Sequence, residues 1–286
     1  MIRDIATIFA GLLGLAFGSF LNVCVTRWPA GESIVEPRSH CRGCARSLTW
    51  WENVPLLSWI LLRGRCRTCG ARIGLRYLLV EAAVGFTWAL LAWRSMPASS
   101  PQPIPNELLI AQLATALAFA VFTYLLIGLA ALDAEYLWLP DVVTYPGIVL
   151  GVCVSLGLAE LQHPLTGEPP LRALLDSVIA TCCGLLLILI IWGVYWIVRR
   201  KEGIGLGDAK LMAMLGAWLG LGGALLSFAI GVVLGAIAAL LVLARSKRGE
   251  AWAGKLPLGT FLCVGGLVAS LWGPQLIGQY LRWAGF

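Results

Sequence analysis

The sequence predicts an all-α polytopic membrane protein with about eight transmembrane helices and a cytoplasmic four-cysteine loop that binds zinc. Three observations lead to this fold class. Of the 286 residues, 59% are apolar and 13% are charged, whereas about a quarter of the residues in soluble domains are charged. Apolar stretches long enough to cross a bilayer of about 30 Å recur along the chain. The cations, finally, gather in a few of the segments that connect these stretches.

Eight apolar segments are the predicted spans, at residues 5–25, 78–95, 109–132, 142–161, 173–198, 209–221, 224–244 and 257–280. Arg3 and Asp4 cancel before the first span, and its strong basic flank follows it, so we expect this span to stay in the membrane rather than to be cleaved as a signal. The sixth span is short, so it is either tilted or joined to the seventh through the glycines that separate them.

The distribution of cations predicts the orientation. One alternate set of connecting segments, at 26–77, 133–141, 199–210 and 245–255, holds 17 of the 21 lysines and arginines. By the positive-inside rule this set is cytoplasmic, which leaves both termini outside. The net charge of +6 is thereby explained by topology, and a nucleic-acid partner is not expected. A proline-rich stretch at 96–107 is predicted to be an extended external linker.

Four cysteines in the large loop have the spacing of a metal site. Cys41 and Cys44 form one Cys-x-x-Cys pair and Cys66 and Cys69 form another, and two such pairs can close a tetrahedral structural zinc site. Nearby arginines, Arg42, Arg65 and Arg67, are expected to offset the charge of the thiolates. A disulfide or a redox-active dithiol is the alternative, and neither is favoured in a reducing cytoplasm. His40, beside the first pair, is expected to be an exposed loop residue.

Ionisable groups at the borders of spans are costly and therefore functional candidates. Asp133 follows the third span at its carboxyl end, where a carboxylate opposes the helix dipole, so we expect that capping cannot account for it. Asp208 precedes the sixth span within Gly205-Leu206-Gly207-Asp208, where helix capping and catalysis are equally good local interpretations. The alternate glycines favour a close approach to another chain or ligand, and hence catalysis.

Two carboxylates at one water-accessible site can act as base and acid, so aspartyl proteolysis is the predicted reaction class. Asp133 and Asp208 are the catalytic candidates. From the helix ends we expect Asp208 to be the base and Asp133 the proton donor. Glu81 is expected to pair with Arg76 or another loop arginine. Auxiliary candidates are Asp141, Glu135, Lys210, Gly205 and Gly207.

Several motifs together resemble the bacterial prepilin peptidases, the type IV leader peptidases of the GxGD aspartyl protease group. They are Gly18-Ser19-Phe20-Leu21-Asn22-Val23, both cysteine pairs, Asn53-Val54-Pro55-Leu56-Leu57-Ser58-Trp59, Leu132-Asp133, Leu139-Pro140-Asp141, Gly205 to Leu211, and Leu256-Pro257-Leu258-Gly259. Many relatives read Asp-x-Asp-His after the third span. This chain has Glu135 and Tyr136 at the last two of these positions.

The resemblance implies a multi-pass protein of the bacterial inner membrane with its active site facing the cytoplasm. It implies an endopeptidase that removes the basic leader of type IV prepilins and type II secretion pseudopilins after a glycine. The cysteine loop further implies methylation of the new N-terminus with S-adenosylmethionine, through residues that the sequence does not identify. Three glutamates of the loop, Glu32, Glu36 and Glu52, are candidates to meet the leader's cations.

The expected organisation is a first transmembrane helix at 1–25, the zinc loop associated with methyl transfer at 26–77, and a protease core embedded in lipid at 78–286. Three other functions stay open from the sequence: a peptidase without methyltransferase activity, an assembly scaffold without catalysis, and a proton-coupled transporter with a zinc-binding regulatory loop.

Overall fold

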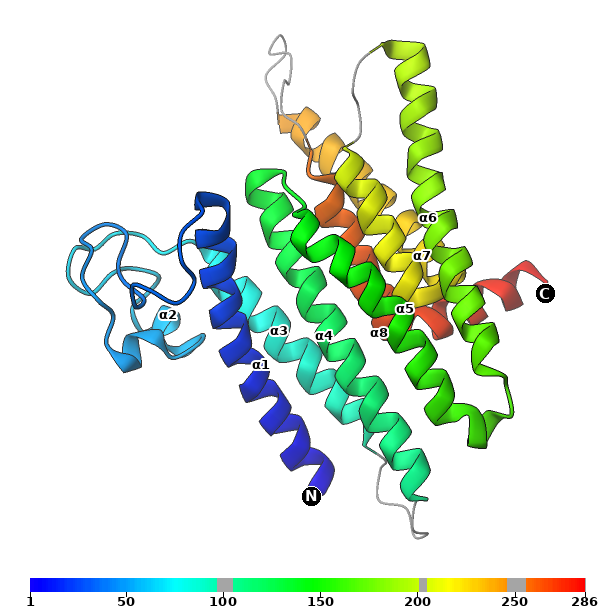
Figure 1. The fold of residues 1–286 in the computed structure, drawn as a ribbon. Helices are drawn as coiled ribbons and strands as arrows, with labels where there is room; N and C mark the ends of the chain where they lie inside the picture. Colours follow the sequence, from blue (N-terminus) through cyan, green and yellow to red (C-terminus); the bar gives the residue numbers. More distant parts are fainter. Residues whose placement is uncertain (97–104, 201–204, 246–255, 286) are drawn as a thin grey trace. The chain divides into compact units, whose positions relative to one another are not determined.

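The computed structural model describes residues 1–96, 105–200, 205–245 and 256–285, and its regular structure is helical (Figure 1). The α-helices are α1 (Ile2–Arg27), α2 (Leu57–Leu61), α3 (Leu75–Ser95), α4 (Asn106–Tyr136), α5 (Asp141–Thr166), α6 (Pro170–Arg199), α7 (Leu206–Arg245) and α8 (Leu258–Ala284). Two short 3₁₀ helices are η1 (Trp28–Ala30) and η2 (Trp50–Asn53). The described ranges contain no β-strand, only two isolated β-bridges in the loop between α1 and α3. The all-α class is confirmed.

In the described part of the chain, seven helices are long and apolar enough to cross a membrane, namely α1 and α3 to α8. The predicted count of about eight is therefore not confirmed, because the segments expected at 209–221 and 224–244 lie in the single element α7. The expected linker at 96–107 falls mostly outside the described residues. So do four cations used for the orientation, Lys201, Lys247, Arg248 and Lys255.

Helix α7 changes direction at Gly220, whose φ of 66° and ψ of −179° are non-helical and are accessible almost only to glycine. The first half of α7 runs antiparallel to α6, as the contact of Gly184 with the Met212 carbonyl and the hydrogen bond from Ser177 Oγ to the Ala217 carbonyl show. The second half runs antiparallel to α8, since Gly231 packs against Leu262 and Ser227 packs against Gly265.

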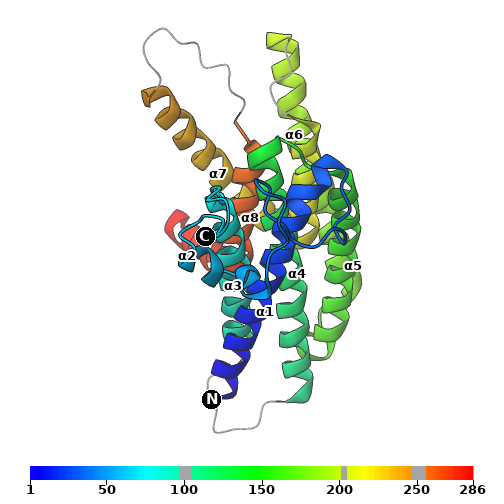
Figure 2. The ribbon, with the colours of Figure 1, turned by 90° about the vertical axis from the view of Figure 1, so that its left-hand side faces the viewer.

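Both ends of α7 consequently lie at the end of its unit where α8 begins (Figures 1 and 2). A straight helix of 40 residues would instead separate its ends by about 60 Å. The first half, residues 206–219, rises only about 21 Å and is too short to cross a 30 Å hydrocarbon core upright. The orientation with both termini outside requires an even number of crossings and stays a prediction.

The chain divides into two compact units, Met1–Ala131 and Leu132–Phe286. In the first unit, α1 and α3 cross closely at two glycines spaced four residues apart. A Cβ on Gly14 would lie 2.8 Å from the Val84 carbonyl oxygen, and one on Gly18 would lie 2.8 Å from the Cα of Glu81. Small residues at this spacing let two helix backbones approach in a membrane. This crossing holds together the end of α1 and the start of α3, between which the cysteine loop is attached.

In the second unit, the first half of α7 is held between α5 and α6. Trp218 Nε1 donates to the Gly147 carbonyl of α5 over 2.8 Å, and Met212, Met214 and Leu215 are fully buried. This packing fixes the amino terminus of α7 at the same end of the unit as the last turn of α4 and the first turn of α8.

Candidate functional site

Asp133 lies in the last turn of α4 and is only 6% exposed. Its Oδ2 accepts two hydrogen bonds from Thr260, one from the backbone N–H over 2.6 Å and one from Oγ1 over 3.0 Å. Thr260 stands in the first turn of α8, where backbone N–H groups lack partners within the helix. Asp133 therefore caps a helix other than its own, which corrects the expectation that capping could not account for it.

Asp208 lies in the first turn of α7 and is 8% exposed. Its backbone N–H donates to the Gly205 carbonyl over 3.1 Å. The carboxylates of Asp133 and Asp208 are close enough to interact electrostatically, and the fully buried thiol of Cys263 interacts with both. The structure thus brings the two predicted aspartates together although they are 75 positions apart in the sequence.

Two glycines give this site its close packing. A Cβ on Gly259 would lie 3.0 Å from both Cγ and Oδ2 of Asp133. A Cβ on Gly207 would lie 3.2 Å from the Cβ of Leu139, the residue just before the Pro140 cap of α5. Gly205 is packed less closely. A Cβ on Gly205 would lie 3.7 Å from Asp208 Oδ2 and 3.9 Å from the Gly207 nitrogen, which are ordinary contact distances. Any larger side chain at Gly259 would displace the Asp133 carboxylate.

The auxiliary candidates lie at the surface beside the aspartates. Lys210 Nζ binds Asp141 Oδ1 over 2.6 Å and stands 5.0 Å from the centre of the Tyr145 ring. The Asp141 side chain is 58% exposed, so this ion pair contributes little to stability. It links the starts of α5 and α7. Glu135 is exposed on the last turn of α4.

The four predicted metal ligands form a cluster. The Sγ atoms of Cys41, Cys44, Cys66 and Cys69 all lie within 4.8 Å of one another, and those of Cys41 and Cys69 are 3.7 Å apart. Four thiolates at the usual Zn–S distance of 2.3 Å stand about 3.8 Å from each other around a tetrahedral ion. The cluster therefore fits a structural Zn²⁺, for which these four residues would be the ligands.

Each cysteine pair sits on a similar turn. The β-bridges His40–Ser47 and Arg65–Arg72 close the two turns. The residue after the second cysteine has a positive φ in both, 55° at Ala45 and 69° at Gly70. The backbone N–H groups of Cys69 and Thr68 lower the pKa of Cys66 to about 6, whereas burial and the neighbouring thiols outweigh the Ala71 N–H and raise the pKa of Cys69 to about 11. A bound metal would hold all four as thiolates.

The structure gives the loop glutamates and arginines other partners than the sequence suggests. Glu52 is buried, and Arg46 binds it over 2.6 Å; this bond, followed by those from Thr49, lowers the pKa of Glu52 to about 2. The Glu52 carboxylate is thus already paired within the loop, and a contact of Glu32, Glu36 or Glu52 with the leader's cations stays a prediction. Arg46 is also the arginine that interacts with Cys66, whereas Arg67 stacks on the Trp51 ring.

The buried acids also have partners that the sequence did not predict. Glu81 is 8% exposed and accepts the Leu56 N–H over 2.8 Å, rather than pairing with an arginine. Thr260 and Cys263 have no individual signal in the sequence. The only indication was their place directly after the Leu256 to Gly259 motif, which begins α8.

Comparison with known proteins matches both parts of the chain. The model of the Bacterial Peptidase A24 N-terminal domain covers residues 12–95, and that of the Type IV leader peptidase family covers residues 120–240. A relative from Stutzerimonas stutzeri, named prepilin leader peptidase/N-methyltransferase, is 33% identical over 96% of this chain and 93% of its own length. The chain belongs to the type IV leader peptidase family.

Other relatives agree with this assignment. The protein of the same name from Pseudomonas aeruginosa is also 33% identical, over 96% of this chain and 93% of its own length. A type 4 prepilin-like proteins leader peptide-processing enzyme from Escherichia coli O78:H11 is 33% identical over 91% of each chain. No solved structure matches the chain.

Proposed function

We propose that this protein is a bacterial inner-membrane aspartyl endopeptidase that cleaves the basic leader from type IV prepilins and type II secretion pseudopilins after a glycine. It then methylates the new N-terminus with S-adenosylmethionine. The observation that carries the proposal is the pair formed by Asp133 and Asp208, buried together at the ends of two apolar helices. The membership of the chain in the type IV leader peptidase family supports the choice of substrate.

The contacts of the pair suggest how it divides the chemistry. Because the Thr260 N–H can only donate, Asp133 Oδ2 must accept, and two donors on one oxygen stabilise its negative charge. We therefore assign Asp133 as the base and Asp208 as the proton donor, the reverse of the assignment from helix ends. Tertiary donors at α8 outweigh the dipole of α4, because they touch the carboxylate directly.

In the proposed reaction Asp133 takes a proton from water through Oδ1, while Asp208 donates its proton to the peptide carbonyl oxygen. As the tetrahedral gem-diol collapses and the C–N bond breaks, the proton on Asp133 passes to the leaving amine nitrogen and Asp208 takes back a proton from a gem-diol hydroxyl, which regenerates both side chains. Infrared difference spectra should show a protonated carboxyl band at neutral pH that disappears in Asp208→Asn. Disappearance in Asp133→Asn alone would restore the earlier assignment.

The orientation proposed for the enzyme follows from its substrate. A prepilin has a basic leader followed by an apolar helix, so the helix would lie in the lipid and the leader at the cytoplasmic face. We place the aspartates and the cysteine loop on that face and both termini outside. Zn²⁺ would stabilise the 26–77 loop, which we associate with methyl transfer, and residues 78–286 would carry the peptidase.

Mass spectrometry of a co-expressed prepilin tests the whole proposal. The wild type should yield a pilin that lacks its leader and carries one added methyl group, and Asp133→Asn and Asp208→Asn should each yield the intact precursor. A pilin that lacks its leader but carries no added methyl group would show a peptidase without methyltransferase activity. An intact precursor with the wild type would favour a scaffold or a proton-coupled transporter.

A further inference from the structure

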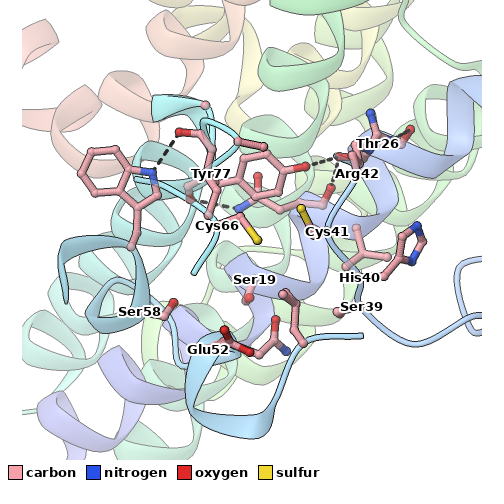
Figure 3. A pocket seen from close by; sticks show the side chains of 18 of the residues that line it. Ser19, Thr26, Ser39, His40, Cys41, Arg42, Glu52, Ser58, Cys66 and Tyr77 are labelled. Atoms are coloured by element: carbon pink, nitrogen blue, oxygen red, sulfur yellow. Dashed lines mark hydrogen bonds between the residues drawn. The ribbon is translucent and has the colours of Figure 1, made fainter. Parts of the chain in front are cut away.

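The first unit contains a cavity of about 260 Å³ between the end of α1, the cysteine loop and the start of α3 (Figure 3). This volume is close to the lower end of the range for small-molecule sites. Its lining includes Asn22, Trp59, Tyr77 and Glu81, together with the exposed Arg72. All of its lining residues belong to the first unit, whereas Asp133 and Asp208 belong to the second.

Asn22 points to a ligand in this cavity. It is only 1% exposed, and its Nδ2 donates to the Tyr77 carbonyl over 3.0 Å. Its Oδ1, however, is buried and has no hydrogen-bond partner among the described residues. Buried polar atoms are nearly always paired, and Asn22 lines the cavity, so a donor brought by a bound molecule would satisfy this oxygen.

The charges around the cavity limit what that molecule can be. Glu81 is a second buried polar group on the wall, 8% exposed, and the exposed Arg72 offers a cation. Most other charged residues of the lining have partners within the protein: Arg27 and Arg42 donate to backbone carbonyls, Arg67 lies over the Trp51 ring and Glu52 is paired with Arg46, while Glu32 is exposed. A wall with both a carboxylate and a guanidinium suits a ligand that carries both charges and disfavours a polyanion such as a nucleoside triphosphate. The Trp59 and Tyr77 rings also line the cavity. Arg76 lies over the Tyr77 ring, 4.7 Å from its centre, and Gly64 packs against Trp59, so at most one face of each ring is left for stacking a base or attracting a cation.

The metal cluster borders the same cavity. Cys41 and Cys66, one from each cysteine pair, belong to its lining (Figure 3). A metal that joins the two turns would therefore also fix part of the cavity wall, which connects a structural ion to the binding of a small molecule.

We propose that this cavity is the binding site of S-adenosylmethionine, with Asn22 and Glu81 as its buried recognition residues. The ligand has an ammonium group, a carboxylate, a sulfonium cation and an adenine, and each finds a complementary group among the residues named above. The proposal rests on the methyl-transfer part of the proposed function and locates it in the first unit. Asn22 accepts a hydrogen bond from the ligand, Glu81 attracts its positive charge, and Arg72 binds its carboxylate.

Direct binding tests the site independently of turnover. The full chain in detergent is dialysed against methyl-labelled S-adenosylmethionine, and the bound ligand is then photocrosslinked and mapped by mass spectrometry. We expect Asn22→Leu, which keeps the shape and removes the acceptor together with the Nδ2 donor to the Tyr77 carbonyl, to weaken binding at least tenfold. Glu81→Gln should do the same, because it keeps an oxygen for the Leu56 N–H but removes the charge. Cross-links should fall on the cavity lining.

The matched control is Gln112→Met. Gln112 also has a buried side-chain oxygen without a partner among the described residues, but it lies on α4 and does not line the cavity. This variant should bind like the wild type. Zinc content and thermal melting show whether each variant is folded. If Asn22→Leu does not fold, the cross-link map of the wild type decides whether the ligand binds in this cavity.

The outcomes separate the site from the function. The proposed site is wrong if the folded variants bind within twofold of the wild type, or if the cross-links fall elsewhere. Methyl transfer by the wild type would still uphold the proposed function in that case. A wild type that neither binds the ligand nor methylates the cleaved pilin overturns both.

Discussion

Substitution of Asp133 separates its chemical role from its structural one. Asp133→Asn removes the base but keeps a carbonyl oxygen for the two hydrogen bonds from Thr260, which span 127 positions of the chain. Asp133→Ala removes the base and the acceptor together. Both variants should therefore lose the same activity and differ in stability.

The magnitudes follow from these contacts. Loss of a general base slows a reaction about 10²- to 10⁴-fold, which corresponds to roughly 3–5 kcal/mol of activation free energy. Loss of a helix cap costs about 0.5–2 kcal/mol, and leaving a buried donor unpaired costs about 1–3 kcal/mol. We expect Asp133→Ala to be less stable than Asp133→Asn by about 2–4 kcal/mol.

Single-turnover cleavage of a purified prepilin measures the first effect, and thermal or denaturant unfolding in the same detergent measures the second. Glu168→Gln is the matched control, because it makes the same chemical change in an exposed ion pair with Arg172, where little effect is expected. Cleavage by Asp133→Asn at a rate within tenfold of the wild type would refute the assignment of Asp133 as the general base. Equal stability of the Asn and Ala variants would refute the proposal that Asp133 caps α8.

Other perturbations test the packing and the metal. Gly259→Ala should strongly reduce leader cleavage, because its Cβ would meet the Asp133 carboxylate at 3.0 Å. The control Gly278→Ala lies on the same helix, and its Cβ would have nothing within 4 Å, so this variant should cleave normally. Equal cleavage rates of the two variants would contradict the expectation. Gly70→Ala should destabilise the metal loop by about 1–2 kcal/mol because of its positive φ. Ala45 has the corresponding place after the first cysteine pair and also a positive φ, so Ala45→Gly should be neutral or stabilising. Competition with a chelator for zinc would measure both effects. Chelation of the metal should unfold the cysteine loop and expose it to limited proteolysis; an unchanged digestion pattern would show that the four cysteines need no metal to hold their turns.

The patterns that predicted most of the architecture are local. The free energy of moving apolar side chains into lipid depends on composition over about 20 residues, so the apolar segments could be read without a structure. Turns that bring two thiols together need only a Cys-x-x-Cys spacing, so the cluster was predictable too. The turn inside α7 was only partly predictable, because Gly220 is one of several nearby glycines and its backbone angles depend on how both halves pack against α6 and α8.

The sequence by itself determined an apolar helical chain, four cysteines with metal spacing and two acids at helix ends. Tertiary structure alone decided which groups these acids touch. Thr260 reaches Asp133 only because α8 starts beside the end of α4, and this contact favours the opposite division of roles from the one that helix dipoles suggested. The same holds for Glu52, which is buried against Arg46, and for the cavity beside Asn22. Such contacts join segments distant in the sequence, and a hydrogen bond acts only over about 3 Å, so no local pattern can encode them.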